Sequence, residues 1–76
     1  MDIQKFIAFF AALFDDTDAN EFRADTRFRD LEEWSSFLAL SVMAMIKSEY
    51  NVAVTAQEMR DAVTVQDLFD TVKSHC

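Results

Sequence analysis

Apolar residues recur at helical spacing near the start of the chain, where they form a single stripe. Its members are Ile3, Phe6, Ile7, Phe10, Leu13 and Phe14. Asp2 precedes the stripe and can cap the first turn. The pattern predicts a helix over roughly residues 3–14 that buries this stripe in a core, with Phe9 off the stripe and exposed.

Residues 37–50 are apolar on almost every side and rich in strong helix formers, and two serines, Ser35 and Ser36, stand where a cap is needed. A helix of this kind is buried on most sides or offers surface to a partner or ligand. Asn51 follows it and tolerates the left-handed conformation that ends a helix without glycine. We expect a central helix that stops there.

The last third of the chain shows two further helix starts after a short extended segment, residues 52–54. The sequence Thr55-Ala56-Gln57-Glu58 fits a capping box, and Thr64-Val65-Gln66-Asp67 gives a second, weaker signal of a helix start. The first opens a short helix, and the second opens a helix that ends near Ser74. The predicted fold is an all-α bundle of four helices, three main and one short, in a single domain over residues 1–76.

Residues 15–35 form a long polar connection whose large apolar residues are spaced too irregularly for one helix. These are Phe22, Phe28, Leu31 and Trp34. Long connections in compact domains tend to be functional or packed by their own side chains, so we expect these residues to anchor the loop. Arg23, Arg27 and Arg29 are expected to pair with neighbouring acids, for at most about 1 kcal/mol each.

Composition narrows the classes of function. The chain has no glycine and no proline, which excludes glycine-rich phosphate loops and dinucleotide fingerprints and disfavours tight β-hairpins. With 51% hydrophobic residues it is too apolar for an acidic disordered tail. Its net charge of −7 disfavours nucleic acid and anionic lipid as ligands and favours basic protein partners.

The apolar run over residues 6–14 is too short for a membrane-spanning helix of about 20 residues. Acidic residues follow it where a signal peptide needs a small-residue cleavage site. We therefore expect a cytoplasmic protein without membrane insertion.

The chain has few side chains suited to catalysis, because its one histidine, His75, and its one cysteine, Cys76, stand at the end of the chain. They leave no base for a serine or cysteine nucleophile and fall short of the roughly four ligands of a structural zinc site. We expect Cys76 to be unpaired, with a redox or dimer-forming thiol as the alternative. The acidic pairs at residues 15–16 and 32–33 lack the ligand spacing of a calcium loop and read as a solvated surface. We expect neither catalytic residues nor a metal.

The most informative stretch is residues 32–37, Glu-Glu-Trp-Ser-Ser-Phe, where serines meet the start of a hydrophobic helix. A serine hydroxyl there either caps the helix or carries a phosphodiester, which free N–H groups and the positive end of the helix dipole would favour. For Trp34 and Phe37, core packing and partner contact both stay open.

At this point the sequence resembles the acyl carrier protein family, over nearly the whole chain. The family carries 4′-phosphopantetheine on a serine at the start of its second helix, usually within Asp-Ser-Leu, and Ser35-Ser36-Phe37 occupies that place. Residues 44–52, Ala-Met-Ile-Lys-Ser-Glu-Tyr-Asn-Val, resemble the end of the family's second helix. Residues 64–68, Thr-Val-Gln-Asp-Leu, resemble the Thr-Val-x-Asp-Leu start of its last helix.

The resemblance implies a carrier rather than an enzyme, with the 4′-phosphopantetheine arm attached to Ser36 and, as the lesser alternative, to Ser35. A separate phosphopantetheinyl transferase would supply the arm from coenzyme A. The monomeric carrier would deliver acyl thioesters to acyl-transferring and chain-elongating enzymes of fatty acid or polyketide synthesis that have basic patches. An aminoacyl-carrying relative and an unmodified helical interaction module remain alternatives.

The chain departs from the family at the expected recognition surface. Ser35 replaces the usual Asp, and the second helix keeps only Glu49 among its usual acids. Acids gather instead before this helix and in the short helix, so partner contacts are expected at Glu32, Glu33, Glu58 and Asp61, with Phe37 and Met45 adding apolar contact. Met43 and Met45 are also expected to line the core or a pocket.

Overall fold

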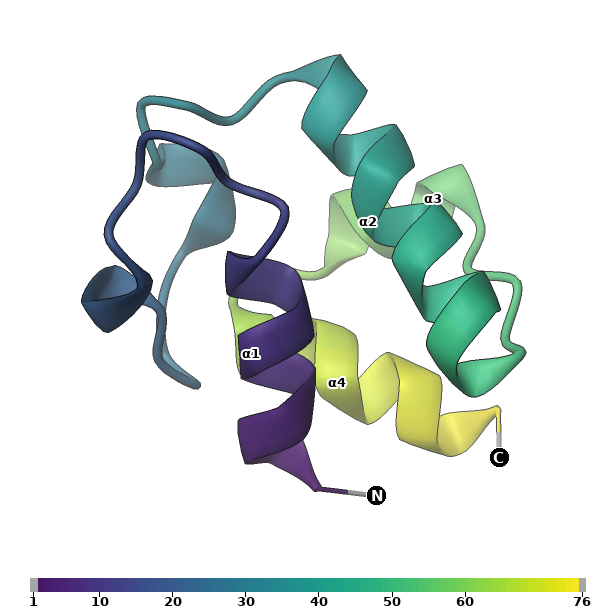
Figure 1. Ribbon diagram of the computed structural model, residues 1–76. Helices are drawn as coiled ribbons and strands as arrows, with labels where there is room; N and C mark the ends of the chain where they lie inside the picture. Colours follow the sequence, from purple (N-terminus) through teal and green to yellow (C-terminus); the bar gives the residue numbers. More distant parts are fainter. Residues whose placement is uncertain (1, 76) are drawn as a thin grey trace.

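The computed structural model describes residues 2–75, and all regular secondary structure in that range is helical. The helices are α1 (Ile3–Ala11), α2 (Ser36–Tyr50), α3 (Ala56–Asp61) and α4 (Val65–Ser74), with 3₁₀ turns at Ala19–Glu21 and Phe28–Asp30 in the connection between α1 and α2 (Figure 1). The prediction of an all-α fold with three main helices and one short one is confirmed.

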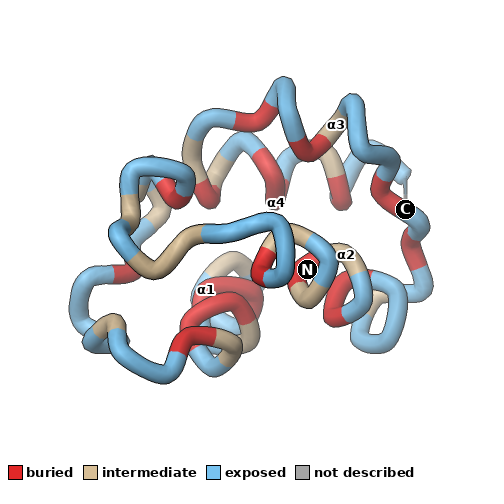
Figure 2. Tube along the Cα trace, turned by 90° about the horizontal axis from the view of Figure 1, so that it is seen from above, coloured by how far each residue is buried: buried red, intermediate tan, exposed pale blue. Residues whose placement is uncertain are grey.

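One core joins the helices. α1 contacts both α2 and α4, and α3 contacts α4. Each helix carries buried residues on one side and exposed residues on the other (Figure 2). The largest fully buried side chains are Phe6, Phe10, Phe28, Ile46, Leu68, Val42, Val65 and Val72. No polar or charged residue among residues 2–75 is buried, so apolar burial is the main force that holds the helices together.

α1 is shorter than predicted, although its stripe packs as expected. The Asp2 carboxylate caps it by accepting from the Gln4 N–H at 3.0 Å, and the α-helix ends at Ala11. Two overlapping 3₁₀-type hydrogen bonds follow: the Leu13 N–H donates to the Phe10 carbonyl at 3.2 Å, and the Phe14 N–H donates to the Ala11 carbonyl at 3.1 Å. This tightening returns Phe14 to the core beyond the helix end.

The expected exposure of Phe9 is wrong. Its ring is partly buried and meets the Tyr50 ring edge-on, with 6.2 Å between the centroids. Tyr50 is the last residue of α2, and it covers the side of α1 that the stripe leaves open. Sequence spacing within α1 alone does not reveal this contact.

α2 ends where the sequence predicts and begins one residue earlier than predicted, at Ser36. The Ser35 hydroxyl accepts from the Leu38 N–H at 3.3 Å and caps the helix. Asn51 adopts φ 57° and ψ 37°, the left-handed conformation, and its N–H donates to the Lys47 carbonyl at 3.0 Å. A non-glycine residue therefore ends the helix by the geometry expected of it.

Both predicted helix starts carry a complete capping box. Thr55 Oγ1 accepts from the Glu58 N–H at 3.1 Å, and Glu58 Oε1 accepts from the Thr55 N–H at 2.9 Å. Thr64 and Asp67 make the same exchange, at 3.1 Å in each direction, and Asp67 Oδ2 also accepts from the Val63 N–H. The second box, weaker by sequence, thus satisfies more donors than the first.

The connection between α1 and α2 is packed by its own aromatic side chains, as predicted. Phe22 and Phe28 are buried, and Leu31 and Trp34 pack against the core. Backbone bonds fasten the loop to the start of α4: the Val65 and Gln66 N–H groups donate to carbonyls of residues 26 and 24, at 3.1 and 2.8 Å.

The arginines of this connection do not pair with acids, contrary to expectation. Arg29 Nη1 donates to the Met59 carbonyl at 2.9 Å, and its guanidinium lies 5.3 Å from the centroid of the Phe28 ring. Within residues 2–75 the one ion pair joins His75 and Glu58.

No helix in this part of the chain is both long and apolar enough to cross a membrane.

Replacing Phe28 by alanine should destabilise the protein by about 3–5 kcal/mol, most of the stability of a domain this small, because the ring is fully buried. Phe37→Ala removes the same side chain from an exposed position and should change stability by at most about 0.5 kcal/mol. Urea unfolding followed by far-UV circular dichroism measures both. Equal losses for the two variants would contradict the packing described.

Candidate functional site

Ser36 is the first residue of α2, and its side chain is exposed. The cap belongs to Ser35, so the interpretation of Ser36 as the helix cap is wrong. Within residues 2–75 the Ser36 hydroxyl has no hydrogen-bond partner, and the N–H groups of Ser36 and Phe37 have no acceptor. The position therefore offers an accessible hydroxyl beside two open N–H donors.

A pocket of about 370 Å³ lies between α2 and α3 and includes Ser36 in its lining; we call it the α2–α3 groove. Its lining residues are Ser36, Ala39, Leu40, Met43, Ala56, Met59 and Arg60. The four from α2 and the three from α3 each follow helical spacing, so two helix faces form its walls. The lining is mostly apolar, and Arg60 is its one charged member.

Phe37 and Leu40 stand out on α2 as exposed large hydrophobic residues, with 75% and 66% of their surface accessible. They are three residues apart and therefore neighbours on the helix surface. We call the pair the α2 ridge. Leu40 was not among the predicted contacts, although its spacing from Phe37 signals the same face.

Met45 does not belong to this surface. Only 9% of its surface is accessible, and it packs in the core, so the expected partner contact through Met45 is wrong while its expected core role is confirmed. Met43 lines the α2–α3 groove, as predicted for a pocket. Trp34 stacks on Phe10, with planes 3° apart and centroids 6.5 Å apart, which favours the packing role for Trp34.

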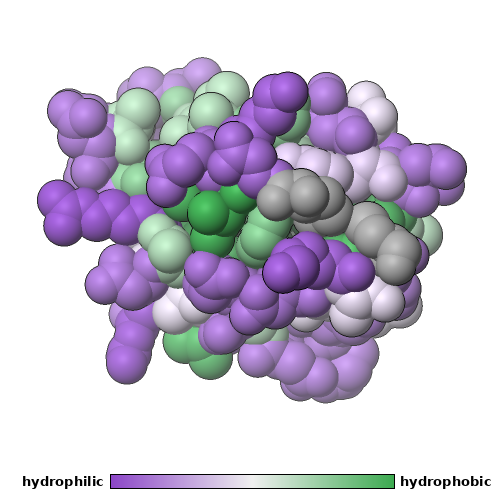
Figure 3. Space-filling model, turned by 90° about the horizontal axis from the view of Figure 1, so that it is seen from below, coloured by the Kyte–Doolittle hydropathy of each residue, from purple (hydrophilic) through white to green (hydrophobic). Residues whose placement is uncertain are grey.

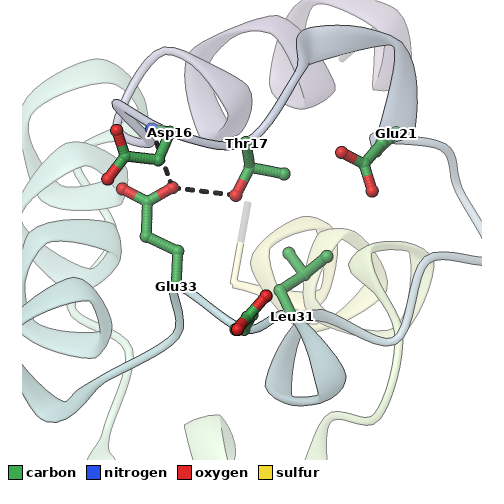
Figure 4. Close-up of a pocket in the computed structure, with 6 residues that line it drawn as sticks. Asp16, Thr17, Glu21, Leu31 and Glu33 are labelled. Atoms are coloured by element: carbon green, nitrogen blue, oxygen red, sulfur yellow. Dashed lines mark hydrogen bonds between the residues drawn. The ribbon is translucent and has the colours of Figure 1, made fainter.

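The carboxylate of Glu33 is engaged inside the molecule. Its Oε2 accepts from the Asp15 N–H at 2.9 Å. Its Oε1 accepts from the Asp16 N–H at 3.0 Å and the Thr17 hydroxyl at 2.8 Å (Figure 4). Partial desolvation opposes ionisation, but these hydrogen bonds outweigh it and lower the pKa of Glu33 below its ordinary 4.5. Glu33 therefore fastens the loop after α1 to the approach of α2.

Glu58 is also engaged, whereas Glu32 and Asp61 are exposed. Besides its bond to the Thr55 N–H, Glu58 accepts at Oε2 from His75 Nε2, 2.8 Å away, and both contacts lower the pKa of Glu58. Asp61 accepts from Gln57 Nε2 at 2.8 Å on the surface of α3. Of the four acids predicted to meet partners, Glu32 and Asp61 keep the most accessible carboxylates.

A second pocket, of about 360 Å³, lies between the loop after α1 and the approach of α2. It is lined by Asp16, Thr17, Glu21, Leu31, Glu32 and Glu33 (Figure 4). Within residues 2–75 no three His, Cys, Asp or Glu side chains are grouped so that they could hold a metal ion. Of the four acids that line this pocket, Glu33 is the one whose carboxylate bonds to the loop.

The face seen from below in Figure 3 is mostly hydrophilic, whereas the α2 ridge is hydrophobic. Hydrophilic side chains cover most of it, and hydrophobic ones show only in small areas between them. Cys76, expected to carry an unpaired thiol, lies outside the described residues.

Comparison with known protein families, with curated proteins and with solved structures gives no match for this chain. Any functional assignment therefore rests on the chemistry at the start of α2.

Ser35→Ala should destabilise the protein by about 1 kcal/mol through loss of the α2 cap, whereas Ser36→Ala should leave stability nearly unchanged. The midpoints of urea unfolding for the two variants give the comparison. A larger loss in Ser36→Ala than in Ser35→Ala would show that the cap is assigned to the wrong serine.

Glu33→Gln should lower the unfolding midpoint at neutral pH, because the amide cannot accept all three hydrogen bonds as the carboxylate does. The pKa of Glu33 is lowered in the folded state, so its contribution is fully present above the ordinary 4.5 and is lost as pH falls through the folded value. The wild type and the variant should therefore converge in acid. Glu32→Gln, at an exposed neighbour, is the control, and an equal loss there would contradict the role of Glu33.

Proposed function

We propose that this chain is an acyl carrier protein, with a 4′-phosphopantetheine arm attached to Ser36 Oγ. One observation carries the proposal: an exposed serine hydroxyl, not used as a cap, stands at the first residue of a long helix and borders an apolar groove. The sequence motifs around Ser36 and around residues 64–68 support the same assignment.

The arrangement of elements supports a carrier fold, a bundle of four helices with a long first loop. Three main helices and the short α3 surround one core, and the connection before α2 is ordered by aromatic packing. This packing gives Ser36 a fixed place at the start of α2, where it is exposed. A tether attached there would start from a fixed anchor.

The residues around Ser36 suit a phosphodiester. The open N–H groups of Ser36 and Phe37 and the positive end of the 15-residue α2 favour a negative group at this position. During attachment Ser36 Oγ would bond to the phosphorus of the arm, the pyrophosphate of coenzyme A would break with adenosine bisphosphate leaving, and the serine proton would pass to the transferase. The thiol of the arm supplies the thioester link to the acyl group.

The partners under this proposal are a phosphopantetheinyl transferase and enzymes of fatty acid or polyketide synthesis that transfer or elongate acyl groups. Glu32 and Asp61 have accessible carboxylates that would steer basic patches on these enzymes. The α2 ridge would add apolar contact beside Ser36. An aminoacyl-carrying relative uses the same attachment chemistry with a different load.

The alternative function is an unmodified helical interaction module. The α2 ridge favours it, because two large hydrophobic side chains are exposed whether or not Ser36 is modified. In that case Phe37 and Leu40 would dock a partner and Ser36 would have no covalent role.

Incubation with coenzyme A and a broad-specificity phosphopantetheinyl transferase, followed by intact mass measurement, tests the proposal. We expect a gain of one phosphopantetheine in the wild type, because the Ser36 hydroxyl is exposed. The gain should vanish in Ser36→Ala and persist in Ser35→Ala, which is matched in chemistry and differs by one position.

No gain with several transferases, in a protein that circular dichroism shows to be folded, would overturn the carrier proposal and favour the interaction module. A gain that persists in Ser36→Ala and vanishes in Ser35→Ala would move the attachment site to Ser35.

A further inference from the structure

Arg60 is the one charged residue that lines the α2–α3 groove, in a chain with twice as many acidic as basic residues. Its side chain is exposed, and it stands on the α3 wall, across from the α2 wall to which Ser36 belongs. The other lining side chains are apolar except for the Ser36 hydroxyl. A cation and a hydroxyl thus border one pocket with no carboxylate among its lining residues.

No acid within residues 2–75 forms an ion pair with Arg60. Its Nη2 donates instead to the neutral Gln57 Oε1 at 3.0 Å, and Gln57 Nε2 donates in turn to Asp61 Oδ1 at 2.8 Å. This chain of bonds holds the guanidinium on the surface of α3. Since one bond of five possible donors is used, the guanidinium keeps most of its hydrogen-bonding capacity for an anion.

An anion attached to Ser36 Oγ would lie in the same groove as the guanidinium of Arg60. Arginine binds phosphate oxygens through two parallel N–H groups, and the geometry of this fork makes the contact stronger and more directional than that of lysine. A phosphate also matches the charge of the groove, because no carboxylate lines it to compete for Arg60.

We propose that Arg60 is a positioning residue, which binds the phosphate of the group attached to Ser36 and holds the root of that group at the α2–α3 groove. The inference rests on the proposed function for the identity of the group, a phosphodiester. The contact would direct the attached chain along the apolar walls formed by Ala39 and Met43 rather than into solvent. Arg60 takes no part in bond making or breaking.

The test uses the full chain with phosphoserine encoded in place of Ser36, so that it needs no transferase. The second ionisation of the phosphate, at about pH 6, is followed by ³¹P NMR at low salt. In the Arg60→Gln variant we expect its pKa to rise by about half a unit, because the guanidinium no longer favours the dianion. Arg60→Lys should give an intermediate value, and about 0.5 M salt should shrink the differences.

Arg23→Gln is the matched control, because Arg23 is an exposed arginine outside the groove lining. It should leave the phosphate pKa at the wild-type value. Equal pKa values in the wild type and in folded Arg60→Gln would overturn the inference.

The carrier protein itself gives the second measurement. After transferase loading, the ³¹P shift of the phosphodiester should change in Arg60→Gln and not in Arg23→Gln; no change in Arg60→Gln would also overturn the inference. If the transferase fails to load the wild type while Arg60 still sets the phosphoserine pKa, the proposed function fails and the phosphate contact stands.

Discussion

The packing of aromatic rings around Phe10 is the contact on which the rest of the structure depends. Phe10 belongs to α1, and its ring meets Phe28 and Trp34 of the connection, with centroids 5.6 and 6.5 Å apart. Ordering a connection of this length costs backbone entropy for every residue fixed, and large aromatic side chains bury the most surface per residue to offset it. Because the ring of Trp34 is held, the chain enters α2 from a fixed point.

The side chains of the three residues before the proposed attachment site are all tied into the structure. Glu33 fastens the loop after α1, Trp34 packs on the aromatic cluster, and Ser35 caps α2. Ser36 is the next residue, and its hydroxyl has no hydrogen-bond partner within residues 2–75. The accessibility of its hydroxyl is therefore a result of its neighbours satisfying the local structure.

Local features of the fold were predictable from sequence because they depend on neighbouring residues. The capping boxes at Thr55 and Thr64 and the left-handed Asn51 follow from short-range hydrogen bonding, and all three are present. The errors come from long-range contacts: Phe9 is covered by Tyr50, and Arg29 reaches a carbonyl on α3. No spacing rule within one segment contains that information.

The candidate site likewise combines local features, which were predictable from sequence, with long-range features, which were not. The position of Ser36 at a helix start is a local property and was predicted, whereas the α2–α3 groove exists only once two helices pack together. The burial of Met45 depends on which side of an almost uniformly apolar α2 faces the core, and periodicity cannot decide this when most positions are apolar. The engagement of Glu33 needs a loop that lies 16 or more residues away.

Asn51 has a consequence for the groove as well as for the helix end. The two walls of the groove are joined by residues 51–55, and the left-handed backbone at residue 51 sets the direction in which the chain turns back toward α3. Holding a residue with a Cβ in this conformation costs roughly 1 kcal/mol, which glycine would avoid. Glycine would also let this turn adopt many more backbone angles. The chain thus accepts a small strain at one residue, and in return the turn between the two walls of the groove keeps a restricted backbone conformation.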